Sequence, residues 1–536
     1  MTVSRRLADY KVRPYTKDFE YFETYKSNHR QHQTEALTIA NSANRGQIVS
    51  PCGTGKTRIQ VSLHVEEMIR LNKEYEYGVF VIASHRLSLN SQLLDQLVDV
   101  AVKCGLPFNV VYVGSYKCDL SKYYTKYHNL GYKPDISKHL ISTDSKEIEK
   151  FIAESRENFK NVIIASTYDS FACLKNIGDI NIITFDEAHN TIQNDFKKNI
   201  LEVKPNILKE HYFTATRKVV GEDGGMNNEV FYGPILVDVF PKLMLERGEI
   251  VEPKLHIIDS EEHQTTNTSN TNMLVKNTIE AYDRHKDMVK RVSFNQEEIG
   301  AKLLIGCNSI EEMDRIYNDP LIKECKDKKI QAFAIASEGC YYNWVPCSKD
   351  QFFIHLNNLS NSEDAIIFNV DMLTEGMDLP SITGVMPLRN LGQTKLIQLV
   401  GRALRLHEKD RNSLYASKLQ PNDRQNYIKP YGYLIVPRHL ASIDEHKRMI
   451  EMAKRFYSEY GTRPEELIIQ EKFIDHQPET LDTMIPYPFK DGKDYDLEHS
   501  ELSLINEVNY SLFEEDMAKL PNDFGKIKYV ERMLVE

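Results

Sequence analysis

The chain has 536 residues, of which 41% are hydrophobic and 27% are charged, with only 20 Pro and 24 Gly. This is a globular composition, and a chain of this length has room for several domains with sizeable cores. The net charge of −11 argues against a simple basic coat protein for nucleic acid.

The cellular location is predicted from two kinds of segment, membrane-spanning segments and signal peptides. No apolar run reaches the roughly 20 residues that span a bilayer, and no apolar signal-peptide core follows the first six residues. We therefore expect an intracellular, cytoplasmic protein with no membrane partner. The eight cysteines are scattered without Cys-x2-Cys spacing, so we interpret them as reduced thiols, mostly in cores.

A phosphate-binding loop is predicted near the N-terminus. Residues 1–29, polar and aromatic, suggest a short cap, and a strand-like run then leads into Ser50-Pro51-Cys52-Gly53-Thr54-Gly55-Lys56-Thr57. A strand, a tight turn with glycines and a helix start form a cradle whose backbone N–H groups and helix dipole favour an anion. Lys56 can reach terminal phosphates and Thr57 can ligate Mg²⁺. Ser50 stands where the general pattern has glycine.

Beyond this loop, strand-like runs alternate with helical patterns. Strands are predicted at 77–83, 108–113, 161–165, 180–185 and 211–214, and again at 302–306, 330–336, 365–370, 383–388 and 432–436, with helices such as 87–102 and 310–317 between them. Such alternation predicts parallel, doubly wound sheets with ligand loops at the carboxyl ends of the strands. We infer two α/β domains joined near residues 248–253. The Lys- and Tyr-rich segment 118–154 is predicted to be an insertion in the first domain.

Two carboxylates end one of these strands. The apolar run 182–185 delivers Asp186 and Glu187, and His189 follows. Asp186 can hold Mg²⁺, and Glu187 can act as general base on the water that attacks a γ-phosphate. Seen alone, this is an acidic turn. Downstream of a phosphate loop, the catalytic interpretation is favoured.

With these two motifs the chain resembles the superfamily 2 helicases with a DEAH/DExH box. It looks closest to the Res-subunit type motors, which include phage UvsW-like and large-DNA-virus helicases. Further segments resemble the family's motifs in the expected order: 83–92 (motif Ia), 165–168 (motif Ic), 214–217 (motif III), 369–380 (motif V) and 398–405 (motif VI). The resemblance covers residues of about 30 to 437.

The resemblance implies two tandem RecA-like parallel-sheet domains and a small, mainly helical C-terminal domain. The expected boundaries are 1–29 for the cap, 30–252 for the ATP-binding domain, 253–438 for the second domain and 439–536 for the C-terminal domain. That last segment has 12 Lys and Arg against 22 Asp and Glu. It is expected to pack on the second domain, with docking of a protein partner as the alternative.

The resemblance also implies a site for ATP and Mg²⁺ between the domains. The residues assigned to the nucleotide and the metal are Arg30 and Gln33 (adenine), Gly53, Thr54, Gly55, Lys56, Thr57, Asp186, Gly376 and Asp378, with Glu187 activating water. Arg402 and Arg405, two arginines three apart on one predicted helical face, and Gln398 are expected to complete the site when the domains close.

Contacts with a nucleic-acid strand are expected through phosphates and sugars, and therefore without sequence preference. The residues assigned to them are Arg86, Ser166, Thr167 and Thr374, and His189, Thr214 and Thr216 are expected to couple the ATP state to the strand. A Lys- and Tyr-rich run at 117–127 is more readily interpreted as a solvated loop than as a further contact.

The predicted function is an ATP-dependent helicase or translocase on single-stranded or branched nucleic acid, with DNA favoured over RNA. Two alternatives stay open. An RNA helicase has the same phosphate-gripping motifs, because these do not read the 2′-OH. A motor subunit of a restriction or defence complex would carry the same motor beside a separate nuclease.

Overall fold

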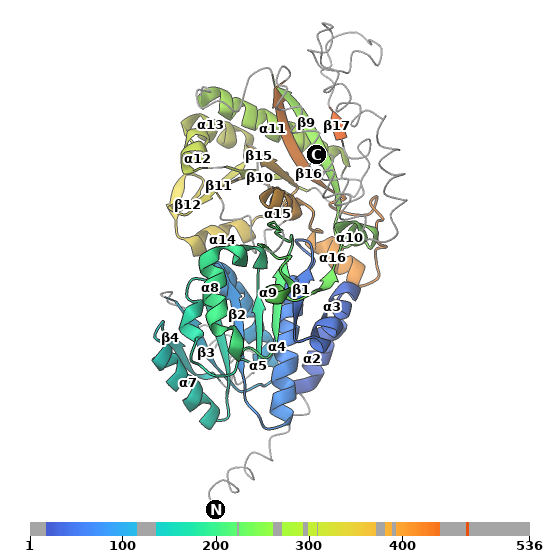
Figure 1. The fold of residues 1–536 in the computed structure, drawn as a ribbon. Helices are drawn as coiled ribbons and strands as arrows, with labels where there is room; N and C mark the ends of the chain where they lie inside the picture. Colours follow the sequence, from blue (N-terminus) through green and yellow to red (C-terminus); the bar gives the residue numbers. More distant parts are fainter. Residues whose placement is uncertain are drawn as a thin grey trace, which may run out of the picture. The chain divides into compact units, whose positions relative to one another are not determined.

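The computed structural model describes residues 18–114, 136–221, 224–260, 271–292, 299–307, 309–370, 381–388, 393–439 and 468–470. The chain divides into two compact units, Met1–Pro51 with Gly55–Val239 and Cys52–Thr54 with Phe240–Glu536. Each unit is built around its own β-sheet (Figure 1). None of the helices within the described ranges is long and apolar enough to cross a membrane.

Among the described residues, the first sheet has eight strands, paired in parallel in the order β4-β3-β5-β2-β6-β7-β1-β8. The inner strands β2, β3, β5 and β6 are mostly apolar and buried along their whole length, the pattern of a parallel sheet covered on both faces. The strands are β1 (Arg45–Val49), β2 (Val79–Ser84), β3 (Phe108–Val113), β4 (Ile136–Ile141), β5 (Asn161–Thr167), β6 (Ile182–Phe185), β7 (Glu210–Thr214) and β8 (Ile235–Asp238).

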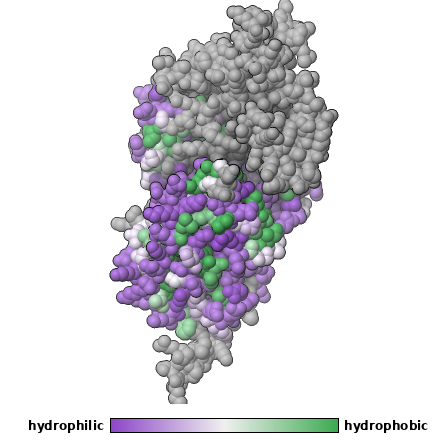
Figure 2. Space-filling model, in the orientation of Figure 1, coloured by the Kyte–Doolittle hydropathy of each residue, from purple (hydrophilic) through white to green (hydrophobic). Residues whose placement is uncertain are grey.

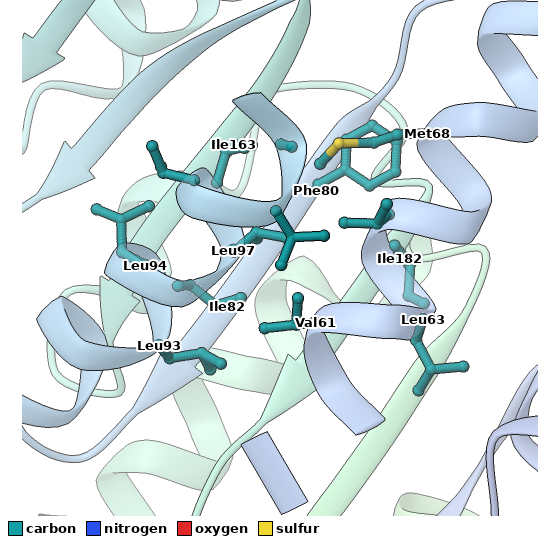
Figure 3. Close-up of a cluster of buried hydrophobic side chains, with 14 of the residues drawn as sticks. Val61, Leu63, Met68, Phe80, Ile82, Leu93, Leu94, Leu97, Ile163 and Ile182 are labelled. Atoms are coloured by element: carbon teal, nitrogen blue, oxygen red, sulfur yellow. The ribbon is translucent and has the colours of Figure 1, made fainter. Parts of the chain in front are cut away.

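Helices cover both faces of this sheet. They are α2 (Asp18–Ser27), α3 (Gln31–Ser42), α4 (Lys56–Lys73), α5 (Leu87–Lys103), α7 (Ser145–Glu157), α8 (Asn194–Val203) and α9 (Glu229–Tyr232), with the 3-10 turns η1 (Phe171–Leu174), η2 (Ala188–Ile192) and η3 (Lys204–Asn206). Successive residues of a strand point to opposite faces. Phe80 and Ile82 therefore pack into the core under α4 and α5 (Figure 3), and Val79 and Val81 into the core under α7 and α8.

Apolar side chains that remain exposed are spread over separate elements. On the face of the first unit drawn in Figure 2, hydrophilic residues predominate and hydrophobic ones form small groups among them. The exposed large hydrophobic residues of this unit include Ile39 on α3, Leu201 on α8 and Val230 on α9. Scattered exposure of this kind is ordinary for a folded protein.

The predicted insertion at 118–154 is wrong in its second half. Ile136–Ile141 forms the edge strand β4, parallel to β3, and Ser145–Glu157 forms α7. Two apolar residues of α7, Ile148 and Ile152, are buried in the core of the unit. This stretch therefore belongs to the sheet and its helical cover. Residues 115–135, which include the whole Lys- and Tyr-rich run at 117–127, lie outside the described ranges.

The second sheet has nine strands among the described residues, in the order β13-β12-β11-β14-β10-β15-β16-β9-β17. The pairs are parallel except at one edge, where β12 and β13 form antiparallel pairs after β11. The strands are β9 (Glu252–Ser260), β10 (Lys302–Gly306), β11 (Gln331–Ala336), β12 (Gly339–Tyr342), β13 (Val345–Cys347), β14 (Ala365–Asn369), β15 (Gly384–Pro387), β16 (Tyr431–His439) and β17 (Ile468–Gln470).

The helices of the second unit surround this sheet. They are α10 (Pro241–Glu246), α11 (Thr271–Val292), α12 (Ile310–Ile316), α13 (Asp319–Lys328), α14 (Lys349–Asn357), α15 (Gln393–Ala403) and α16 (Glu408–Tyr415). One face is closed by α11, α12 and α13, which share a core with strand residues such as Leu303 and Ile305. The prediction of two α/β domains with parallel sheets is confirmed. The predicted helical domain at 439–536 lies outside the described residues apart from His439 and the short strand β17.

Candidate functional site

Three neighbouring strands bring the predicted nucleotide motifs to one edge of the first sheet. Strands β6, β7 and β1 are adjacent and parallel, so their carboxyl ends meet. The phosphate loop follows β1, the acidic pair follows β6, and Thr214 ends β7. The backbone N–H of Ser50 donates to the Thr214 carbonyl at 2.9 Å. Ligand loops of parallel α/β sheets lie at this edge.

The phosphate loop has the backbone that an anion cradle needs. Gly53 and Gly55 have φ angles of 84° and 83°, a left-handed conformation that glycine adopts most readily. Helix α4, 18 residues long, begins directly after Gly55 at Lys56, so its N-terminal dipole points toward the loop. The Lys56 ammonium donates to the Ser50 carbonyl at 3.0 Å, which holds it across the loop. Thr57 follows in the first turn of α4.

The Gln33 side chain packs against this loop. Its Oε1 accepts the Arg30 backbone N–H at 2.9 Å, and its Nε2 lies 3.5 Å from the Gly55 carbonyl. A methyl group on Gly55 would collide with this amide. The structure thus brings Gln33 to the loop, where it also caps the start of α3 through Arg30.

Asp186 is held from three sides. Its N–H donates to the Ala83 carbonyl at 2.7 Å, and its carbonyl accepts the Tyr168 hydroxyl at 2.5 Å. The Gln60 amide donates to its Oδ1 at 2.8 Å. Burial, followed by the neighbouring Glu187 carboxylate, raises the pKa of Asp186 to about 6, while Lys56 opposes that rise. The buried carboxylate therefore favours a further positive charge.

The sequence reasoning missed Gln60. It lies in α4 four residues after Lys56, and i and i+4 residues share a helix face. That spacing was the available signal, because it places a second polar residue on the face of α4 that carries Lys56.

Glu187 occupies an unusual backbone conformation. Its φ of 51° and ψ of 50° are left-handed, which is sterically costly for a residue with a Cβ. The 3-10 turn η2 begins at the next residue. The chain thus turns sharply where β6 ends, and this turn sets the direction in which Glu187 leaves the sheet.

The three residues assigned to coupling lie together beside Glu187. His189 Nδ1 is 3.5 Å from Glu187 Oε2 and 3.1 Å from Thr214 Oγ1. The Thr214 hydroxyl donates to the Thr216 carbonyl at 2.7 Å, so it accepts from the histidine. This pattern indicates that the His189 proton is on Nδ1.

Asn190 extends this group toward the segment that resembles motif Ia, and the sequence reasoning missed it. Its Nδ2 lies 3.2 Å from His189 Nε2 and 3.3 Å from His85 Nδ1. His85 precedes Arg86 directly. A series of side-chain contacts thus connects Thr214 to His85, the residue before Arg86.

The residues assigned to strand contacts share an edge with this site. Strands β2 and β5 pair in parallel, with Ser84 opposite Thr167. Arg86 stands at the start of α5, and the Ser84 hydroxyl donates to its carbonyl at 2.8 Å. The Ser166 hydroxyl is buried and donates to the Thr167 carbonyl at 3.0 Å. Ser166 is therefore enclosed at this edge, since its carbonyl also accepts the Asn90 side-chain amide at 2.7 Å.

In the second unit, the segment that resembles motif VI differs from the expectation in one respect. Gln398 and Arg402 lie on α15, four residues apart and on one face. Arg405 does not share that helix, because α15 ends at Ala403. Beyond the helix, Arg405 forms an antiparallel bridge with Ile250. The predicted pair of arginines on one helical face is wrong, and Arg405 is placed by the chain beyond the helix.

Three assigned residues cannot be located. Thr374, Gly376 and Asp378 lie outside the described residues. Within the described ranges, no group of three or more His, Cys, Asp or Glu could hold a metal ion by itself.

The chain is similar to known proteins in its sequence and in its fold. Residues 26–219 match the model of the family described as "Type III restriction enzyme, res subunit". IRC3 of Saccharomyces cerevisiae, described as a candidate ATP-dependent helicase, is 22% identical over 295 residues, which cover 51% of this chain and 38% of that protein.

Two solved structures share the fold. The Type ISP restriction-modification enzyme LlaBIII bound to DNA aligns with a TM-score of 0.56 and 17% identity over 91% of this chain and 34% of its own. A nuclease-deletion mutant of the Type ISP enzyme LlaGI, in complex with a DNA substrate mimic, aligns with a TM-score of 0.53 and 16% identity over 92% of this chain and 33% of its own. The chain thus spans about a third of the length of these structures.

Proposed function

Since this chain carries the tandem two-sheet motor fold of superfamily 2 helicases, we propose that it is an ATP-dependent helicase or translocase that acts on nucleic acid, and on DNA rather than RNA. One observation carries this proposal: the phosphate loop, the acidic pair and the end of β7 share one edge of the first sheet. DNA is supported by the two similar restriction-modification structures, which contain DNA or a mimic of it.

ATP is the substrate, and its phosphates lie on the loop in this proposal. Backbone N–H groups of Gly53, Thr54 and Gly55 and the Lys56 ammonium bind them. Gln33, packed against the loop, and Arg30 position the base. The orientation of Gln33 supports this role, because its amide is fixed to α3 at one end and lies at the loop at the other.

Thr57 and Asp186 are the residues that would hold Mg²⁺. A hydroxyl and a carboxylate are the hard oxygen ligands that this ion prefers, usually together with substrate phosphates. The raised pKa of Asp186 also fits a site that gains a cation. When bound, the ion neutralises charge on the phosphate oxygens.

Glu187 is the general base for the attacking water in this proposal. Arg402, Arg405 and Gln398 act on the transferring phosphoryl group from the second unit, and Gly376 and Asp378 contribute to the nucleotide site. Arginine and glutamine donors suit this role because charge builds up on the phosphoryl oxygens.

The strand is held by Arg86, Ser166, Thr167 and Thr374. Since the donors include backbone groups and a guanidinium, the grip is on the phosphate backbone and weakens as salt rises. His189, Thr214 and Thr216 link this grip to Glu187. The contacts from Thr214 through His189 and Asn190 to His85 support that route.

The proposal is tested by nucleic-acid-stimulated ATP hydrolysis. Lys56→Ala and Glu187→Gln should each lower turnover at least ~100-fold, the usual scale for loss of an acid–base or phosphate-binding group, with the fold intact by circular dichroism. Lys138→Ala on β4, a lysine with a side chain that is 58% exposed, is the matched control. Unchanged turnover in both site variants would contradict the mechanism.

The preference for DNA is tested separately with the wild-type protein. ATPase rates and unwinding are compared on single-stranded DNA, single-stranded RNA, forked DNA and an RNA–DNA hybrid at one salt concentration. Stronger stimulation by DNA is expected. Stronger stimulation by RNA would replace the DNA assignment with an RNA helicase.

A second candidate is the motor part of a larger restriction or defence assembly. The family description and the two restriction-modification structures favour it. The C-terminal segment 439–536 is the proposed docking region for a partner. Affinity purification of the tagged chain from its native cells should then recover a nuclease or methyltransferase, and recovery of the chain alone would count against this candidate.

A further inference from the structure

A buried lysine connects two segments of the second unit. Lys429 is 3% exposed and precedes β16. Its Nζ donates to the Ile382 carbonyl at 2.7 Å and to the Arg405 carbonyl at 2.6 Å. Burying an amine is costly unless its hydrogen bonds are made. Here two backbone oxygens meet it at the short distances of charge-assisted hydrogen bonds.

The lysine is itself fixed by an acidic residue. Asp410 on α16 accepts the Ile428 N–H at 2.9 Å with Oδ1 and the Lys429 N–H at 3.1 Å with Oδ2. Burial lowers the pKa of Lys429 to about 7; Asp410 opposes this, while Arg405 and Lys302 add to it. The backbone of Lys429 is thus anchored to α16, and its ammonium extends from a fixed point.

Arg405 needs such support because it lacks a helix. The helix that carries Gln398 and Arg402 ends at Ala403. Beyond it, the Leu404 carbonyl accepts the Val251 N–H at 2.9 Å, and Arg405 bridges Ile250. These contacts hold the chain up to Arg405, and Lys429 holds the Arg405 carbonyl itself.

We infer that Lys429 is a positioning residue that fixes the backbone of Arg405, and through it the direction of the guanidinium, for hydrolysis of ATP. The inference rests on the proposed function, in which Arg405 acts on the transferring phosphoryl group. A donor of this kind has to be held within about 0.5 Å of its productive position. Because Ile382 shares the same ammonium, Lys429 also ties Arg405 to the segment that leads into β15.

Lys302 provides a matched control. It is a second buried lysine of the same unit, and its Nζ donates to the Ser360 carbonyl at 2.9 Å. Burial lowers the pKa of Lys302 to about 8. Lys302 is thus also a buried lysine whose amine meets a backbone carbonyl, but the hydrogen bonds that the structure describes for it do not reach Arg405. A general cost of losing a buried amine should appear in both variants.

The experiment compares Lys429→Met, Lys302→Met, Arg405→Ala and the double variant Lys429→Met/Arg405→Ala. With saturating single-stranded DNA, kcat and KM for ATP are measured alongside the melting temperature. Lys429→Met should lower kcat about tenfold with KM within threefold of wild type, and Lys302→Met should leave kcat unchanged. The double variant should be no slower than Arg405→Ala, because Lys429 acts through Arg405.

Two results would overturn the inference: equal loss of kcat in both lysine variants, or a double variant whose losses multiply. Asp410→Asn covers the case in which Lys429→Met does not fold, because it loosens the anchor of Lys429 and keeps the lysine side chain. A folded Asp410→Asn protein should show reduced kcat with unchanged KM, and an unchanged kcat would again overturn the inference.

The same measurements distinguish an error in the role of Lys429 from an error in the proposed function. If the wild-type chain does not hydrolyse ATP, both are overturned. If it does, and Arg405→Ala is slow while Lys429→Met keeps the wild-type kcat, only the role of Lys429 is overturned.

Discussion

Gln60 joins the helix of the phosphate loop to the strand of the acidic pair through one side chain. Its amide donates to Asp186 Oδ1 at 2.8 Å, and both residues are buried. One carboxylate oxygen of Asp186 is thereby occupied and the orientation of the group is set. The proposed metal site depends on that orientation, because Mg²⁺ tolerates little deviation in its ligand geometry.

Replacing Gln60 with Leu should weaken Mg²⁺ binding in the presence of nucleotide. Loss of a buried hydrogen bond to a charged group costs about 1.5–3 kcal/mol. This corresponds to roughly a tenfold or larger rise in the apparent dissociation constant of Mg²⁺. Titration of Mg²⁺ against a fluorescent ATP analogue measures this without turnover. Gln31→Leu is the control, since Gln31 also donates to a carboxylate, Glu35, but on the surface. Equal Mg²⁺ constants for both variants would contradict the role of Gln60.

The sequence indicated the candidate site residues that follow local patterns and missed those that depend on distant partners. Lys56, Asp186 and Glu187 are recognisable because each stands next to a strand or glycine turn that explains it. Gln60 and Asn190 meet partners that are 126 and 105 residues away. A single polar residue in a helix or turn does not indicate which distant residue it contacts.

Helix α2 packs on the helix of the phosphate loop. Lys26 Nζ lies 2.9 Å from Glu66 Oε1, and the Arg58 guanidinium donates to the Tyr25 carbonyl at 2.7 Å and lies 4.2 Å from the centre of the Tyr25 ring. The Tyr25 ring also contacts Phe22. Since α4 begins at Lys56, whatever fixes α4 also fixes the loop.

Tyr25→Ala should therefore reduce both stability and nucleotide affinity. Removing a large aromatic side chain from a packed site costs about 3 kcal/mol, less where the ring is partly exposed. Urea unfolding measures the first effect and a fluorescent ATP analogue the second. Tyr75→Ala, at a tyrosine that is 55% exposed, is the control. A destabilised Tyr25→Ala protein with wild-type nucleotide affinity would show that α2 does not support the loop.

Elements buried on both faces were the easiest to predict. The strands Phe108–Val113 and Lys302–Gly306 match their predicted bounds because every residue in them is buried. The edge strand β4 was missed since Lys138 and His139 interrupt its apolar pattern. The hairpin of β12 and β13 was also missed. It turns at Asn343 and Trp344 with φ angles of 47° and 66°, and tryptophan is not a residue that signals a left-handed turn.

Both units contain histidines that are neutral because they are buried. Burial lowers the pKa of His64 to about 3 and that of His211 to about 4 in the first unit. It also lowers the pKa of His285 to about 3 in the second unit. The unfolded chain, with a histidine pKa of about 6.5, binds more protons than the folded chain below that pH. The stability of the folded protein is therefore unaffected by the protonation of these histidines above about pH 6.5. Below that pH, their protonation in the unfolded chain lowers the free energy of unfolding.

The whole protein should lose stability steeply between about pH 6.5 and pH 4. Each such histidine contributes up to ~1.4 kcal/mol per pH unit in this window. Urea unfolding at several pH values measures the slope. His64→Gln should make it shallower, because glutamine does not titrate, and the exposed His355→Gln should not. A slope that is the same in wild type and His64→Gln would contradict the assignment.

The left-handed backbone of Glu187 has a consequence for how this chain can be engineered. A residue with a Cβ in that conformation costs roughly 1–2 kcal/mol, and glycine would relieve most of it. Optimisation for folding alone would therefore replace the proposed catalytic base with glycine. The resulting protein would be more stable but would lack the proposed ATPase activity. At this position, the proposed role of Glu187 in the reaction runs against the demand of the fold.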